Sequence, residues 1–128
     1  MSFKHSFNLS LIVLLLTISQ LVISQETFVL KGDSLLLNKR LILETTDLNL
    51  NNLGLTRLPV NLNEFKNLKS ITLQNNKLEN VQILDELVFL EEVDLSKNPN
   101  LNISNVAEQL VNLSQLKYLN LSDCELRY

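Results

Sequence analysis

Few residues of this chain carry side chains that could catalyse a reaction or bind a metal. The sequence has a single His, His5, and a single Cys, Cys124. A zinc site usually takes four ligands, and a nucleophile needs a base within hydrogen-bonding reach. One residue of each type supplies neither, so we predict a protein that is not an enzyme and that needs no metal or cofactor.

The densest acidic group is formed by Glu91, Glu92 and Asp94. Such a group can act as a carboxylate pair or hold a cation weakly. Glu92 and Asp94 are two positions apart, however, so on a strand they point to the same side. This spacing is typical of a solvated strand face, which is the interpretation we favour.

The charge balance argues against a nucleic-acid partner. The 128 residues contain 11 Lys plus Arg and 14 Asp plus Glu, which gives a formal net charge of −3. Nucleic-acid binding needs a clustered basic surface, and Lys39-Arg40 is too short a run. The glycines Gly32 and Gly54 are isolated, so they form no phosphate-binding loop.

Residues 1–24 have the pattern of a secretory signal peptide. Lys4 and His5 precede an apolar run from Leu9 to Ile18, and Val22 and Ser24 suit the positions before a cleavage site. The run is short for a membrane span, which needs about 20 apolar residues. We therefore expect a secreted protein with no stable membrane insertion after cleavage; the alternative is an uncleaved anchor that tethers the chain to a membrane.

The rest of the chain repeats a leucine pattern. Leu occurs 32 times and Asn 17 times in 128 residues, and this double excess is typical of a repeat. The pattern L-x-x-L-x-L-x-x-N/C-x-L starts at Leu68, Leu90 and Leu116, and a weaker copy starts at Thr45. In the copy that starts at Leu90 the last Leu is displaced by one position. The four starts are 23, 22 and 26 residues apart.

These copies resemble the leucine-rich repeat family. The resemblance implies an α/β solenoid, a right-handed superhelix with short parallel strands on its concave face and short helices or 3₁₀ turns on its convex face. Residues 45–128 would hold about three full repeats and a truncated fourth. Residues 25–44 do not match the pattern, so we expect an N-terminal capping segment there.

The repeat pattern assigns each side chain a direction. The L-x-L step has period two, so Ile71 and Leu73 point inward, as do their equivalents in the other copies. By the resemblance, the amides of Asn76 and Asn98 bond the backbone of neighbouring coils as a ladder. Leu53 replaces the Asn in the first copy and leaves that bend in question, whereas the family accepts Cys at position 124.

The segments outside the strands contain helix signals. Asn105 and Glu108 have the spacing of a capping box, and Val106, Leu110 and Leu113 then share one helix face. In the capping segment, Asp33 is placed to cap a helix that would run from Leu36 to Glu44. Residues 27–30 are predicted to form an edge strand.

The function implied by the resemblance is recognition of a protein partner through the concave face. The outward strand positions form a polar, slightly acidic surface with one aromatic anchor, Tyr118, which suits a polar or basic partner. The residues predicted to form this surface are Asp47, Asn49, Asn51, Ser70, Thr72, Gln74, Glu92, Asp94, Ser96, Tyr118, Asn120 and Ser122.

Two further predictions concern association and modification. The last copy stops within a return segment, so the alternative function is a structural subunit, or a fragment of a longer repeat protein, that associates through an uncapped C-terminal edge. Three Asn-x-Ser sequons follow residue 24, at Asn102, Asn112 and Asn120, and we expect N-glycosylation there in a secreted chain. On the strand face, a glycan at Asn120 would crowd a ligand.

Overall fold

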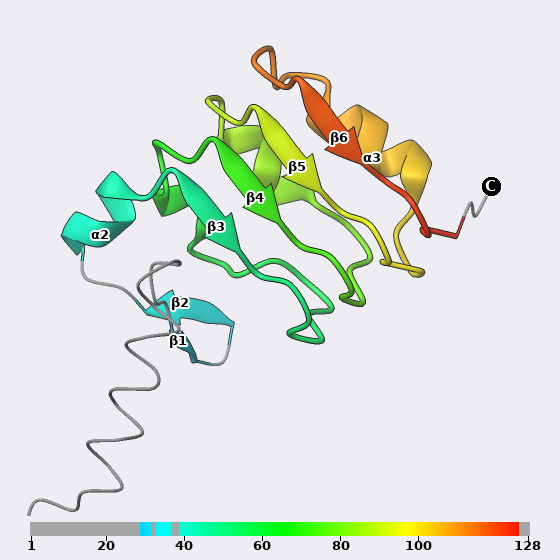
Figure 1. Cartoon of the computed structure of the whole chain (residues 1–128), viewed down its shortest axis with the longest axis horizontal. Helices are drawn as coiled ribbons and strands as arrows, with labels where there is room; N and C mark the ends of the chain where they lie inside the picture. The colour runs from blue at the N-terminus through cyan, green and yellow to red at the C-terminus, as the bar shows by residue number, and fades with distance from the viewer. Residues whose placement is uncertain (1–28, 32, 37–38, 126–128) are drawn as a thin grey trace, which may run out of the picture.

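The computed structural model of this chain describes residues 29–31, 33–36 and 39–125, so the predicted signal peptide lies outside the described residues. The described chain forms an antiparallel hairpin followed by a four-stranded parallel sheet, with short helices in the connections (Figure 1). In chain order the elements are β1 (Val29–Lys31), β2 (Ser34–Leu36), α2 (Lys39–Glu44), β3 (Asp47–Asn49), η1 (Leu62–Glu64), β4 (Ser70–Thr72), η2 (Gln82–Glu86), β5 (Glu92–Asp94), α3 (Ile103–Leu110) and β6 (Tyr118–Asn120).

The parallel sheet has the strand order β3-β4-β5-β6, which is the order along the chain. Each strand pairs with the next in the register set by the leucine pattern, so that Leu48 lies beside Ile71, Ile71 beside Val93, and Val93 beside Leu119. Side chains alternate across a strand, and the first three of these four residues are buried. The predicted strands are therefore confirmed, and the inward positions of the first three are buried, whereas Leu119 in the last strand is 37% exposed.

The connections between strands return along the other side of the sheet, where Figure 1 shows the helical segments behind the strands. The segments η1 and η2 are 3₁₀ helices, and α3 is the one α-helix in the connections from β3 to β6. Each of these segments turns apolar side chains into the core, including Leu62, Leu84 and Val106, which are fully buried. The predicted 3₁₀ turns and short helices are present.

Helix α3 begins earlier than predicted. Its N-cap is Asn102, whose Oδ1 accepts a hydrogen bond from the backbone N of Asn105 at 3.2 Å. Asn102 has an extended backbone, which is the conformation a capping side chain needs in order to reach the third helical residue. Asn105 lies inside the helix, so its prediction as the cap was wrong.

The predicted helix capped by Asp33 is also wrong at its start. Leu36 lies in strand β2, which pairs with β1, and the helix begins only at Lys39. The side chain of Asn61 explains the extended conformation, because its amide bonds both the N and the O of Leu35, at 2.8 and 2.7 Å. A helix could not offer both groups of one buried residue to the same amide. Of the predicted edge strand, residues 29 and 30 are in β1, whereas Thr27 and Phe28 lie outside the described residues.

Each strand of the parallel sheet is followed by one non-glycine residue with a left-handed backbone, and Gly54 adds a second left-handed position after β3. The non-glycine residues are Asn52, Asn75, Lys97 and Asp123, with φ between 56° and 60°. They lie 23, 22 and 26 positions apart, which are the intervals of the sequence pattern. Asn and Asp tolerate this conformation better than most residues, so three of the four turns use favourable side chains.

The two predicted ladder amides bond the backbone of adjoining turns. Asn98 is fully buried; its Nδ2 donates to the carbonyls of Leu73 and Leu95, at 3.0 and 2.8 Å, and its Oδ1 accepts from Leu78 N at 3.1 Å. Asn76 makes the same kind of contacts one turn earlier, where its Oδ1 accepts from the N of Leu53 and of Leu55. The bend at Leu53 is thus held by the amide of the following turn.

Cys124 continues this row of buried polar groups. Its Sγ donates to the carbonyl of Leu95 at 3.2 Å, and the thiol is partly buried and unoxidised. A thiol is a weak donor and offers one hydrogen where an amide offers two. The last rung of the ladder is therefore weaker than the rungs made by Asn76 and Asn98.

Long-range hydrogen bonds in the described residues share a narrow range of sequence separation. Among pairs more than ten residues apart, the shortest separation is 20 positions, from Leu78 to Asn98, and the longest is 29, from Leu95 to Cys124. The sheet bonds lie within these limits. Between the described residues, the long-range hydrogen bonds therefore join neighbouring copies of the sequence pattern.

Candidate functional site: the exposed face of the parallel sheet

The residues predicted for binding form three rows across one face of the parallel sheet, which we call the strand face. The first row is Asp47, Ser70, Glu92 and Tyr118, and the second is Asn49, Thr72, Asp94 and Asn120, as the strand register shows. The third row, just beyond the strands, is Asn51, Gln74, Ser96 and Ser122. The register aligns the predicted residues in rows, as the repeat pattern indicated.

Side chains of the second row stabilise the turns that follow the strands. The Oδ1 atoms of Asn49, Asp94 and Asn120 each accept a hydrogen bond from the backbone N two residues later, at 2.9–3.0 Å. This is the Asx-turn geometry of short polar side chains. Sequence reasoning missed this role, although an Asn or Asp two positions before the turn in three of the four copies was a usable signal.

The second row has one exception in its interior. Thr72 does not make this bond, because the backbone N–H of Gln74 donates instead to Oδ1 of Asn51 at 2.6 Å. The Thr72 hydroxyl is buried and has no hydrogen-bond partner among the described residues. An unpaired buried hydroxyl costs free energy, because its hydrogen bonds to water are lost without replacement.

Ser96 is not available for binding. Its side chain is only 1% exposed, and its hydroxyl donates to Oδ1 of Asp94 at 2.6 Å. The prediction that Ser96 contributes to a binding surface is therefore corrected, because Asp94 draws the hydroxyl down into the turn. Ser122, at the equivalent position of the last copy, is exposed.

The first row carries the chemistry that remains accessible. Asp47 and Glu92 are exposed carboxylates, and Tyr118 is 54% exposed. The hydroxyl of Ser70 lies 3.5 Å from Oε2 of Glu92, a contact too long to hold that carboxylate firmly. The carboxylates of Asp47 and Glu92 and the ring of Tyr118 thus face solvent along one row. The half-buried Ser70 lies between the two carboxylates.

A charged row that the sequence analysis missed runs beside the strand face, one position before each of β4, β5 and β6. Glu91 lies between Lys117, which donates to its Oε2, and Lys69, whose Nζ is 3.8 Å from its Oε1. The hydrogen bond from Lys117 and the charges of both lysines hold the pKa of the Glu91 carboxyl below its usual value. The alternation of Lys, Glu and Lys at one repeat position was the available signal.

The lowered pKa of Glu91 predicts a pH-dependent contribution to stability. The ionised carboxylate favours the folded state, so the contribution is present above the carboxyl pKa of the unfolded chain and is lost as pH falls through the lower pKa of the folded chain. The difference in unfolding free energy between wild type and Glu91→Gln should therefore shrink between pH 6 and pH 3, roughly the range in which carboxyl groups titrate. Urea denaturation at each pH measures it. A difference that does not change with pH would contradict this role.

Two hollows among the described residues lie off the strand face. One, of about 450 Å³, is lined by Leu58, Val60, Ile83 and Glu86 on the side of the 3₁₀ helices. Another, of about 480 Å³, lies before the strands and is lined by Leu43, Asn67 and Phe89. Among the described residues no group of three His, Cys, Asp or Glu side chains is arranged to hold a metal ion.

The three sequons differ in their surroundings. Asn112 is exposed in the turn after α3, and its side-chain amide makes no hydrogen bond to a described residue. Asn102 uses Oδ1 as the helix cap. Asn120 uses both ends of its amide, because Nδ2 donates to Asp94 Oδ2 at 3.2 Å while Oδ1 accepts from Ser122 N.

Comparison with known proteins adds no family to this description. A scan of the chain against protein-family models gave no match, and a search of curated proteins gave none either. Among the helices of residues 29–125 that the structure describes, none has the length and apolarity needed to cross a membrane.

Proposed function

We propose that the chain is a leucine-rich repeat protein whose strand face is the concave binding surface for a protein partner. The observation that carries the proposal is the buried amide of Asn98, bonded to backbone groups of two turns. This bonding supports a solenoid of stacked turns, an architecture that presents its strands as an extended recognition surface. The parallel register and the recurring left-handed residues support the same interpretation.

The partner that suits this surface is polar and carries positive charge. Asp47 and Glu92 give the first row its negative charge, and Asp94 adds a carboxylate in the second row. Tyr118 offers a large ring with a hydroxyl, the kind of side chain that anchors interfaces. Four strands offer limited area, so one copy would bury about 1,200 Å² in total or less, the size of a weak interface.

The test is a binding screen against purified secreted and cell-surface protein domains, read by surface plasmon resonance. For each domain that binds, the variant Glu92→Arg with Tyr118→Ala should bind at least about tenfold more weakly, because it reverses a charge and removes the anchor. Both side chains are exposed and Tyr118 is not a ladder residue, so the fold should persist. Equal binding by wild type and variant would overturn the assignment of the strand face.

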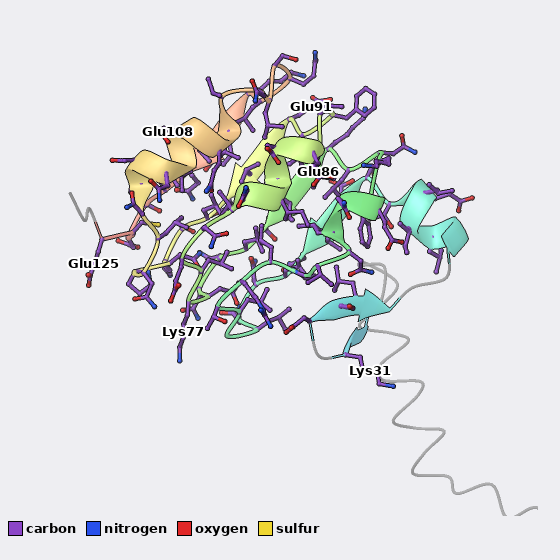
Figure 2. All side chains as sticks on the ribbon, turned by 180° about the vertical axis from the view of Figure 1, so that it is seen from behind. Lys31, Lys77, Glu86, Glu91, Glu108 and Glu125 are labelled. Atoms are coloured by element: carbon purple, nitrogen blue, oxygen red, sulfur yellow. The ribbon has the colours of Figure 1, made fainter. Side chains whose placement is uncertain are left out.

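The matched control places the same charge change on the opposite side of the protein. Glu108 is exposed on α3, and Figure 2, viewed from the helix side, shows it projecting away from the sheet. Glu108→Arg should change the affinity of a strand-face partner less than about twofold at physiological salt. If a domain no longer binds Glu108→Arg but still binds the strand-face variant, the binding site for that domain lies on the helix side of this chain.

The sequons give a prediction that tests secretion as well. If the chain passes through the secretory pathway, Asn112 should carry glycan in most molecules, because its amide is exposed and unbonded. Asn102 should be modified less often and Asn120 least, since its Nδ2 donates to Asp94. Glycopeptide mass spectrometry of the chain expressed in a eukaryotic host measures the occupancies. A fully occupied Asn120 beside an unmodified Asn112 would contradict the ranking.

A further inference from the structure

The outer edge of β6 leaves the apolar core open at one end of the sheet. Within β5, Val93 and Leu95 are fully buried. Their equivalents in β6 and just after it are Leu119, which is 37% exposed, and Leu121, which is partly buried. These leucines differ from their buried counterparts because no strand of the described chain lies on the far side of β6 (Figure 1).

The backbone groups that face this edge follow from the hydrogen bonds on the other side. Asn120 O accepts from Leu95 N and Ser122 O accepts from Lys97 N, each at 2.9 Å, so even-numbered residues of this stretch face β5. The backbone N–H and C=O groups of successive residues in a strand point to opposite sides of that strand. Those of Leu119 and Leu121 therefore point to the open edge. Leu121 N has no acceptor among the described residues, and Leu121 O accepts only from Cys124 N, at 3.4 Å.

We propose that a second copy of this chain covers the edge, with the two β6 strands antiparallel about a two-fold axis through Asn120. In this register Leu119 of each copy lies opposite the partner's Leu121. Both residues turn their N–H and C=O groups toward the edge, so they form two hydrogen-bonded pairs of the antiparallel type. Asn120 lies opposite the same residue of the other copy, as a pair without backbone hydrogen bonds.

The neighbouring registers are poorer. A shift in one direction places Leu121 opposite Lys117, whose N already donates to Glu91 O at 2.8 Å. A shift in the other direction places Leu119 opposite Asp123, whose φ of 57° has left the strand conformation. The register centred on Asn120 is therefore the one that pairs the edge-facing groups of both leucines.

The side chains of this register are complementary, which is why a second copy is the proposed occupant. The two inward leucines of each copy face leucines of the other. Just beyond the paired leucines, Lys117 and the partner's Asp123 bring side chains of opposite charge to the same end of the junction, and the symmetry produces this charge pair twice. A two-fold interface requires such self-complementarity, in which one strand supplies both members of each pair. The dimer would also join two strand faces into one continuous surface and so double the area that a ligand can cover.

Disulfide cross-linking tests the register directly. The full chain is produced without glycosylation, with Cys124→Ser removing the native thiol and keeping a donor at that position. Cysteines opposite each other in a pair without backbone hydrogen bonds have Cα atoms about 4.5 Å apart, within disulfide range. Under mild oxidation, Asn120→Cys should therefore give at least about fivefold more disulfide-linked dimer than Tyr118→Cys, which in this register faces the partner's Ser122.

The matched control is Asn49→Cys, in the same row but at the far end of the sheet. It should stay monomeric on a non-reducing gel. If Asn120→Cys forms no more dimer than Asn49→Cys, or if Tyr118→Cys forms more than Asn120→Cys, the proposal is overturned. The N-terminal segment is identical in all variants, so association through it cannot produce these differences.

Sedimentation velocity of the unsubstituted chain provides a measurement that does not depend on new cysteines. The wild type should show a concentration-dependent dimer, and Asp123→Lys should weaken it at least about fivefold through the repelled Lys117. The backbone accepts this change, since Lys97 has φ 58° at the equivalent turn position. A wild type that stays monomeric up to about 1 mM would overturn the proposal and leave another chain, or a further segment of a longer one, to cover the edge.

Discussion

Replacing Asn98 by Ala should lower the free energy of unfolding by roughly 2–4 kcal/mol, a large fraction of the stability of a small domain. The fully buried amide bonds one N–H and two carbonyls of the backbone. The carbonyl of Leu73 keeps a second donor in Asn76 Nδ2, and that of Leu95 keeps Cys124 Sγ. The N–H of Leu78 loses its acceptor, so this buried donor and the cavity account for most of the loss.

Urea denaturation followed by circular dichroism measures the effect. Asn80→Ala is the matched control, because Asn80 is exposed and makes no hydrogen bond to a described residue; its substitution should change the free energy by less than about 0.5 kcal/mol. If Asn98→Ala were as mild as Asn80→Ala, the ladder would contribute little to stability. The proposed repeat architecture would then lose its main support.

Leu95→Ala should cost about 2–5 kcal/mol, because the side chain is fully buried and its removal leaves a cavity between turns. Leu119→Ala removes the same atoms from an inward position of the last strand. Leu119 is 37% exposed, so the expected cost in a dilute monomer is only roughly 1 kcal/mol. Comparing the loss of unfolding free energy in the two variants therefore distinguishes the buried interior of the core from its exposed end at β6.

Thermal and urea unfolding at low protein concentration give this comparison. Leu73→Ala serves as a second interior variant, since Leu73 is also fully buried. A cost below about 1 kcal/mol for both interior variants would contradict the register of the core. A large cost for Leu119→Ala that appears only at high protein concentration would indicate that the open edge is covered by association.

The sequence predicted the strands because a two-residue period and a repeat of 22 to 26 positions act together. A register shifted by one residue would turn Ile71, Val93 and their equivalents to solvent. The same repeat located the ladder at Asn76 and Asn98, and it placed the three rows of the strand face. These features depend on patterns that recur, so that each copy supports the interpretation of the others.

Features that occur once were predicted less well. The hairpin of β1 and β2 depends on Asn61, 26 positions after Leu35, and no local signal in residues 33–36 reveals that contact. The capping-box spacing pointed to Asn105, whereas the cap of α3 is Asn102, whose backbone is extended. Ser96 is buried by a hydrogen bond to Asp94 that alternation along a strand does not predict.

The narrow range of hydrogen-bond separations determines how the protein would respond to mechanical force. No hydrogen bond of the described residues spans more than 29 positions, so none ties the first turn to the last. If the proposed repeat architecture holds, the described part of the chain pulled between β3 and β6 would meet no single clamp, and its repeats would unfold one after another, each releasing a similar length of chain. Unfolding would begin at β6, where the thiol of Cys124 takes the place of a ladder amide and Leu119 is partly exposed.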